Sequence, residues 1–307
     1  MGESRPGATD YALLLLLSAI WGSSFLFVKL AVDTAPAASS TAVRLAVGAF
    51  TMIVIARLAG QGLPHGRRIW GMICLAALFG NALPFTLISW GEEVIDSAHA
   101  AILMAVMPLT TIFLAHFLTA DEKLNPWKGA GVLLGIAGLV VLIGPGKIMQ
   151  FGGDVLRQLA VAGAAACYGA NAVITRSLVG LPRRAMVASV LTVSFLMMVP
   201  LALYADQPWD LRPSAMSWGA MVLLGFLHTA LATLLMFTIV SRQGASFFSQ
   251  INFLIPLFGV LWGVMALSEV PPPNAYLALA LILAGIAVAR RGMVTPRTGM
   301  GIAPGRR

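Results

Sequence analysis

The chain has 307 residues, of which 59% are hydrophobic and only 10% are charged, and its formal net charge is +8. An ordinary soluble domain is about 25% charged, so this composition excludes a water-soluble globular enzyme. The basic residues are spread over short segments between apolar runs instead of forming one patch, which argues against nucleic-acid binding. We therefore expect an integral membrane protein whose main partner is the lipid bilayer.

Apolar runs of bilayer-spanning length, about 20 residues, recur along the whole chain. The first run lacks a small-residue cleavage site, so we expect a retained helix instead of a signal peptide. The segment 292–307 is rich in Gly, Pro and Arg and is predicted to be a disordered basic cytoplasmic tail. Ten transmembrane helices are predicted, at 10–32, 39–59, 68–90, 97–119, 126–144, 154–178, 184–205, 214–240, 245–267 and 273–290.

The basic residues predict the orientation of these helices. With the N-terminus inside, fifteen of the twenty lysines and arginines fall in cytoplasmic segments and only Lys147, Arg157 and Arg212 fall outside. This asymmetry follows the positive-inside rule and predicts that both termini are cytoplasmic. The expected location is the bacterial inner membrane. The remaining two, Lys29 and Arg44, lie inside spans near the outer surface, where we expect their long side chains to snorkel to water. The alternatives are a salt link to Glu92, Glu93 or Asp96, or an outer-gate contact to a substrate carboxylate.

The two halves of the chain, 1–146 and 147–291, resemble each other. Because each half holds five helices, an odd number, the second half enters the membrane from the opposite side. Inverted repeats of this kind are typical of alternating-access transporters, whose substrate site lies near the midplane between the halves. Four matches recur in order at an offset of 147 or 148: Trp21-Gly22 with Tyr168-Gly169, Trp70-Gly71 with Trp218-Gly219, Pro108-Leu109 with Pro256-Leu257, and Glu122 with Glu269.

Several motifs carry a resemblance to a known family over essentially the whole chain. They are the run Ala-Ile-Trp-Gly-Ser-Ser-Phe at 19–25 with Lys29, the Pro108 helix followed by Glu122, the Gly-rich helix 129–144, and the counterparts around Pro256 and Glu269. The pattern resembles the ten-helix EamA branch of the drug/metabolite transporter superfamily. Within that branch it is most similar to the YddG-type exporters of aromatic and other neutral amino acids. The resemblance implies an all-α membrane fold of two inverted five-helix repeats around a central cavity.

Polar residues deep in the spans are candidates for a substrate site, because such residues are expensive in a bilayer. They could hydrogen-bond the amino and carboxylate ends of a substrate, or they could join neighbouring helices. His228 is the sharpest candidate, since it interrupts an otherwise apolar run; a neutral histidine bonded to a backbone carbonyl is the alternative. The predicted cavity residues are Trp21, Ser24, Asn81, Tyr168, Asn171, His228, Gln250 and Asn252.

Trp21 and its repeat partner Tyr168 could form an aromatic wall for an apolar side chain, or they could serve helix packing. Prolines within spans free a backbone carbonyl and are candidate hinges, in particular Pro84 and the repeat-related pair Pro108 and Pro256. The spacings Gly131-x-x-x-Gly135 in the fifth helix and Ala280-x-x-x-Ala284 in the tenth suggest close packing, of these helices with each other or across a weak homodimer. We therefore expect a monomer or a weak homodimer.

All twelve carboxylates fall in predicted loops or at helix ends. Antiporters of lipophilic cations need a buried carboxylate that holds proton and cation in turn, so this inventory favours neutral or zwitterionic cargo and allows a facilitator without proton coupling. Glu122 and Glu269 are expected to cap the helices that follow them. The leading hypothesis is an exporter of neutral amino acids, in particular aromatic ones; export of other small metabolites or drugs is the alternative.

No enzyme motif stands out in the sequence. It contains no phosphate loop, no metal-ligand cluster with suitable spacing and no nucleophile–base set. The cysteines Cys74 and Cys167 lie in apolar runs and resemble small hydrophobic residues more than a disulfide or metal pair. A membrane-embedded enzyme should show clustered catalytic residues and a sensor should show an appended domain. We predict neither, and we expect no cofactor and no metal.

Overall fold

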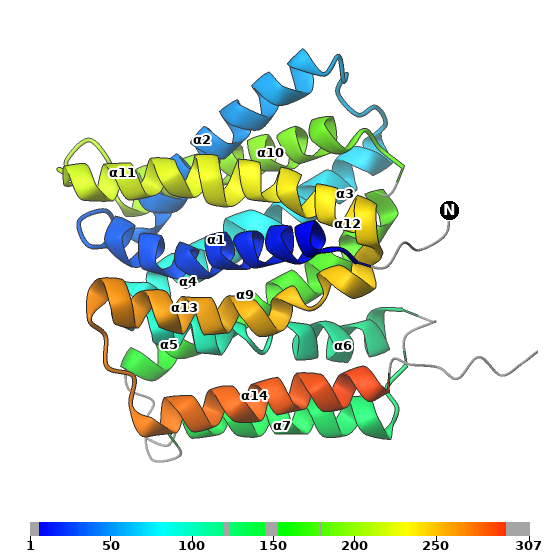
Figure 1. Cartoon of the computed structure of the whole chain (residues 1–307). Coiled ribbons are helices and arrows are strands. Elements are labelled where there is room, and N and C mark those ends of the chain that lie inside the picture. The colour runs from blue at the N-terminus through cyan, green and yellow to red at the C-terminus, as the bar shows by residue number, and fades with distance from the viewer. Residues whose placement is uncertain (1–5, 120–122, 145–152, 179, 293–307) are drawn as a thin grey trace, which may run out of the picture.

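The computed structural model describes residues 6–119, 123–144, 153–178 and 180–292. These residues form helices and connections, without a strand among them (Figure 1). Eight helices in this part of the chain are long and apolar enough to cross a membrane, and the apolar helix Ile251–Leu267 is one residue shorter than the 18-residue minimum. The prediction of an all-α membrane protein is confirmed.

The first half contains five helical passes. The third and fourth passes are each divided within the span, whereas the other three are continuous. The elements are α1 (Ala8–Val32), α2 (Ala37–Leu58), α3 (Arg67–Ala77) with η1 (Leu78–Ala82) and α4 (Leu83–Glu92), α5 (Ser97–Met104) with α6 (Met107–Leu118), and α7 (Pro126–Ile143).

The second half repeats this order. Gly244 has φ of 80°, a left-handed conformation that glycine adopts without a Cβ penalty, and it ends the long run of α12 near the predicted break at 240–245. The elements are α9 (Gly153–Ile174) with η2 (Thr175–Leu178), α10 (Arg183–Ala205), α11 (Ala215–Leu223) with η3 (Leu224–Leu231) and α12 (Ala232–Phe248), α13 (Ile251–Leu267) and α14 (Pro273–Arg291).

The third pass of each half contains a π-helical segment, which the sequence analysis did not predict. η1 spans Leu78–Ala82 and η3 spans Leu224–Leu231. The repeat offset of 148 places the first segment inside the second, so the irregularity is itself repeated. π-helical turns are rare and occur frequently at functional sites. The two segments therefore mark a region of interest in the middle of each span.

The two ends of the helical bundle can be told apart by the chain termini. Gly7 and Gly292 lie at one end, here called the proximal end, toward the right of Figure 1. The opposite, distal end carries the connections 33–36, 93–96, 206–214 and 268–272. The proposed boundary of the repeats near residue 146 and all of the proposed tail 292–307 except Gly292 lie outside the described residues.

α7 and α14 pack against each other, as the small-residue spacings suggested. A Cβ atom on Gly131 would collide with the carbonyl oxygen of Gly285, and one on Gly138 would collide with Ile282. Only glycine permits this approach of the two backbones. The face of α14 that makes the contact contains Gly285 and Ala289, whereas Ala280 is exposed. The close packing is therefore between two helices of one chain.

Candidate functional site

His228, in η3, is the centre of a buried polar cluster. Its side chain is 2% exposed. Its Nδ1 lies 3.2 Å from the carbonyl oxygen of Leu223, five residues earlier, and its Nε2 lies 3.0 Å from the hydroxyl of Ser23 on α1. The indole N–H of Trp21 donates to the carbonyl oxygen of His228 at 3.1 Å. Both ring nitrogens thus have partners, and the histidine joins η3 to α1.

Aromatic rings surround this cluster on the α1 side. The rings of Phe27 and His228 have centroids 5.1 Å apart, and the rings of Trp21 and Phe248 meet edge to face at 6.2 Å. Ser24 donates its hydroxyl hydrogen to the carbonyl oxygen of Trp21 in its own helix, at 2.6 Å. Trp21, Ser24 and His228, three of the predicted cavity residues, therefore lie together.

Arg44, on α2, is the residue that the sequence analysis misjudged most. Snorkelling to water was the wrong expectation, because the side chain is only 8% exposed. Its Nε donates to the hydroxyl of Thr229 at 3.0 Å, and its guanidinium carbon lies 3.6 Å from the ring centroid of Phe85. A guanidinium over an aromatic face is held there by the ring quadrupole. The physical reason for the error is that α2 packs on η3, which covers the path to the surface.

Glycines bring α2 and η3 close enough for these contacts. A Cβ atom on Gly225 would lie 2.5 Å from the backbone oxygen of Arg44, and one on Gly48 would lie 3.3 Å from the methyl group of Thr229. In return, the Thr229 hydroxyl donates to the carbonyl oxygen of Leu224 at 2.9 Å. The π-helical turn and the glycines together place Thr229 opposite Arg44.

The guanidinium of Arg44 keeps unused donors. Arginine has five N–H groups, and the two terminal nitrogens of Arg44 donate to none of the described residues. The charge also interacts electrostatically with Tyr168 and His228. Arg44 thus stands between the α1–η3 cluster and the first π-helical region.

Tyr168, Asn171 and Asn81 form a second group near η1. Tyr168, on α9, is half-buried and packs against two of the hydrophobic core clusters. The side-chain amide of Asn171 lies against Gly80, the neighbour of Asn81, and its Oδ1 is buried without a hydrogen-bond partner in the described part of the chain. The structure therefore brings six of the eight predicted cavity residues into two groups, with Arg44 beside both.

The other two predicted cavity residues lie elsewhere. Gln250 is the residue before α13 and Asn252 is in its first turn, so both belong to the proximal end of the bundle. The candidate hinges also differ in setting. Pro84 follows η1 directly and Pro108 follows the break between α5 and α6, whereas Pro256 lies inside the uninterrupted α13. Their role as hinges stays a prediction.

A second polar cluster closes the distal end. Lys29 is partly exposed, and its ammonium group donates to the backbone oxygens of Glu92 at 2.7 Å and Ile95 at 2.9 Å. Glu92 itself is 0% exposed, and both of its carboxyl oxygens lack a partner among the described residues. The sequence analysis missed this buried carboxylate because Glu92 is the last residue of α4 and was counted with the loops.

Glu269 caps a helix, but not the one that was expected. Its two carboxylate oxygens accept from the backbone N–H groups of Ser97 and Ala98, each at 2.8 Å, so it caps α5 instead of α14. The first N–H groups of a helix lack partners inside the helix, and a carboxylate there is favourable. The end of α13 lies beside the start of α5, which brings Glu269 there. Its repeat counterpart Glu122 lies outside the described residues.

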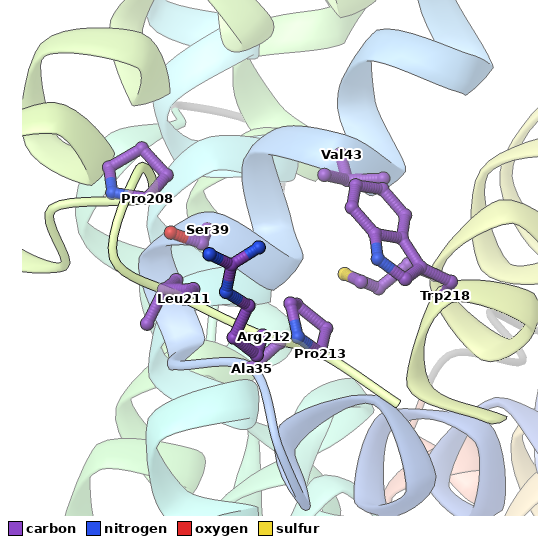
Figure 2. Close-up of a pocket in the computed structure, with 9 residues that line it drawn as sticks. Ala35, Ser39, Val43, Pro208, Leu211, Arg212, Pro213 and Trp218 are labelled. Carbon is purple, nitrogen blue, oxygen red and sulfur yellow. The ribbon is translucent and has the colours of Figure 1, made fainter. Parts of the chain in front are cut away.

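A cavity of about 390 Å³ opens at the distal end, away from both groups. It lies between the start of α2, the 206–214 connection and α11, and Figure 2 shows Arg212 and Ser39 on one side of it and Trp218 on the other. None of the eight predicted cavity residues lines it. The predicted substrate residues therefore do not belong to this cavity; six of them lie in the two interior groups.

Comparison with known proteins identifies the fold. The profile of the EamA-like transporter family matches residues 9–144 and 156–291. Protein PagO of Salmonella typhimurium is 32% identical over 133 residues, a match that spans only 43% of this chain and 43% of that protein. A protein solved by crystallography shares the fold, with 22% identity and a TM-score of 0.65 over 93% of this chain and 98% of that one.

Two further relatives align over nearly their whole length. The aromatic amino acid exporter YddG of Ancylobacter novellus is 26% identical over 93% of this chain and 98% of its own. A probable terminal-alkyne amino-acid exporter of Streptantibioticus cattleyicolor is 25% identical over 96% of this chain and 97% of its own. Because the family profile covers both halves of the chain, this protein belongs to the EamA-like transporter family and is a multi-pass membrane transporter built from two such repeats.

Proposed function

We propose that this transporter exports neutral amino acids, in particular aromatic ones, and that Arg44 binds the substrate carboxylate. The observation that carries the proposal is the guanidinium of Arg44, which is buried over Phe85 and keeps its terminal N–H groups unused. A guanidinium binds a carboxylate in a two-pronged geometry, and such charge-assisted bonds are among the strongest hydrogen bonds in proteins.

The surroundings of Arg44 fit the rest of such a substrate. Phe85 lies under the guanidinium, and Tyr168 is close enough to interact with its charge. Phe27 and Trp21 line the neighbouring His228 cluster. Binding pockets for small molecules combine mostly apolar walls with a few polar anchors, and aromatic rings pack well against one another. An aromatic amino acid offers one ring for the walls and one carboxylate for the anchor.

The names of the relatives favour the same cargo. Two proteins that align with nearly the whole chain are described as amino-acid exporters, one of them for aromatic amino acids. The excess of basic residues at the proximal connections favours a cytoplasmic proximal end and an outward-facing distal end. Substrate would then load from the proximal side and leave at the distal side by alternating access.

Counterflow in proteoliposomes tests the cargo and the anchor together. Wild-type protein should exchange labelled phenylalanine and tryptophan, but not phenylalaninamide or phenethylamine, which lack the carboxylate. Loss of a bond to a charged group costs about 1.5–3 kcal/mol, so Arg44→Gln should weaken phenylalanine exchange by about 10- to 100-fold.

Arg212→Gln is the matched control, because Arg212 lines the distal cavity and not the interior clusters. It should exchange phenylalanine like the wild type. If phenethylamine and a lipophilic cation move as fast as phenylalanine, or if Arg44→Gln exchanges normally, the proposal fails and export of other metabolites or drugs takes its place.

A further inference from the structure

Glu92 is a buried carboxyl group that the proposed substrate site does not use. It ends α4 at the distal end, with 0% of the residue exposed. Neither carboxyl oxygen has a hydrogen-bond partner in the described part of the chain. An ionised carboxylate without a partner is very costly in an apolar environment, whereas the protonated group is far less so. The geometry thus favours a Glu92 that carries its proton in this conformation.

Charged groups surround Glu92, but none of them forms a hydrogen bond with its carboxyl group in the described part of the chain. Lys29 on α1, Arg44 on α2 and Glu269 after α13 are close enough to interact with it electrostatically. The ammonium group of Lys29 is held by two backbone oxygens, Arg44 is bonded to Thr229, and Glu269 is bonded to the amides of α5.

Two other ionisable groups at this end also have partners. The neighbouring Glu93 points to the surface and pairs with Arg157 of α9 at 2.6 Å. His99 of α5 is bonded to Gln158 at 3.0 Å. Glu92 is therefore different from Glu93, the next residue along the chain, which is partly exposed and paired.

We propose that Glu92 is a proton-binding site of the transport cycle, which takes up a proton from the outer solution when the distal ends of α1 and α4 close and releases it when they separate. The proposal rests on the proposed function only in assigning the distal end to the outside. The ligand is a proton from water, and no covalent step is involved.

Closure and burial of the carboxyl group are the same movement. When Lys29 reaches the backbone oxygens of Glu92 and Ile95, α1 lies against the end of α4. An ammonium group at the C-terminal end of a helix is favourable, which stabilises the closed arrangement. Separation of α1 from α4 would return the Glu92 side chain to water, where a glutamate is ionised near neutral pH. One contact thus links the position of the helices to one proton.

The sign of the pH dependence follows from proton linkage. The closed state binds one more proton than the open state, so a fall in outer pH favours closure. One proton per closing event shifts the equilibrium by up to about tenfold per pH unit. For an exporter, an acidic outer solution would then return the empty carrier to the state that faces the cytoplasm.

The distance between the distal ends of α1 and α4 tests this without any substrate. Spin labels at Asp33→Cys and Val94→Cys, both exposed positions, report the gap in protein that carries Cys74→Ala and Cys167→Ala. Double electron–electron resonance is measured on the full-length protein in nanodiscs, in buffers from acidic to mildly alkaline pH. It gives the fraction of molecules in which the two labels are at the short distance of the closed state. This closed fraction should rise as the pH falls.

Glu92→Gln keeps the shape of the side chain but cannot ionise, so it should show the short distance at every pH. Glu93→Gln is the matched control and should keep the wild-type response. A wild-type distance that does not change with pH, or an unchanged response in Glu92→Gln, would overturn the proposal. The distance measurement contains no substrate, so a failure of amino-acid counterflow would not affect the proposal for Glu92. In the same way, a pH-independent distance would not affect the proposal of amino-acid export.

Discussion

The π-helical segments of the two repeats occupy equivalent places but serve different neighbours. In the first repeat, η1 presents Gly80 to the flexible amide of Asn171 on α9. In the second repeat, η3 presents His228 to α1 and Thr229 to Arg44 of α2. The first contact is with the end of one side chain, whereas the second is with two helices of the other half of the chain.

The difference indicates how an inverted repeat gains a function. The repeat duplicates the fold and even the widened helical turn, but it does not duplicate the polar side chains. His228 and Thr229 each bond a carbonyl oxygen five residues earlier, so the widened turn supplies acceptors that a regular α-helix would keep for itself. The charged anchor of the proposed substrate site, Arg44, meets only the second of the two segments.

The largest difference between the two π-helical segments is expected when a glycine in each, Gly80 in η1 and Gly225 in η3, is replaced by alanine. A Cβ atom on Gly225 meets the backbone of α2, which cannot move aside, whereas one on Gly80 meets only the Asn171 side chain. Gly225→Ala should therefore cost about 1–3 kcal/mol by overpacking and abolish phenylalanine exchange. Gly80→Ala should lower the melting temperature much less. Thermal unfolding in detergent compares the two, and equal losses would contradict the proposed difference.

Removal of the Thr229 hydroxyl should have the next largest effect. Thr229→Val leaves the Nε of Arg44 without its acceptor in a buried place, which costs about 1–3 kcal/mol. The matched control is Thr233→Val, since Thr233 bonds only the carbonyl oxygen of Thr229 in its own segment. Phenylalanine affinity and melting temperature should fall for Thr229→Val and stay near wild type for Thr233→Val. If Thr233→Val lowers phenylalanine affinity and melting temperature as much as Thr229→Val does, Thr229 has no special role.

The link between α1 and η3 should show a smaller effect. Ser23→Ala removes the partner of the His228 Nε2, and a typical hydrogen bond contributes about 0.5–1.5 kcal/mol. Ser24→Ala is the control, because Ser24 bonds only its own helix. Melting temperatures should rank wild type and Ser24→Ala above Ser23→Ala. The reverse order would indicate that the serine–histidine contact does not hold α1 to η3.

The smallest effect is expected for the pH dependence of His228 variants. Both ring nitrogens of His228 are engaged in the packing of η3, so His228→Gln should lower the transport rate without changing its pH profile. The wild type and Glu92→Gln are the references in the same assay. If His228→Gln removes the pH response and Glu92→Gln keeps it, the proton site is at the histidine and not at Glu92.

The fold could be predicted from the sequence because the bilayer imposes long apolar spans. Eight spans meet the length and hydropathy requirements, and Gly244 marks the break that was expected between the eighth and ninth helices. The repeat was visible in Trp21 and Tyr168, which occupy equivalent helices. The π-helical segments were not predicted, since no residue pattern in η1 or η3 distinguishes a π-helical turn from a regular α-helical turn.

The candidate site could be predicted only in part. The sequence singled out Trp21, Ser24 and His228 because they are polar or aromatic residues deep in apolar runs, and the structure places them together. Their role in substrate binding stays a prediction. Arg44 was expected to reach water, with contact to a substrate carboxylate only as an alternative, and Glu92 was counted with the loops. In both cases nearness to a helix end was taken as access to water. Only the packing of η3 on α2 and of α1 on α4 encloses these two charges. Burial by a neighbouring helix depends on tertiary packing, so it cannot be predicted from the sequence of one span alone.

Equilibrium binding to purified protein tests the central claim most directly, because it measures recognition without transport. Labelled phenylalanine is bound to the wild type and to Arg44→Gln, with unlabelled phenylalanine or phenylalaninamide as competitor. We predict that phenylalanine displaces the label, that the amide does not, and that Arg44→Gln retains little binding. Equal displacement by the amide, together with full binding to Arg44→Gln, would contradict a carboxylate anchor at Arg44.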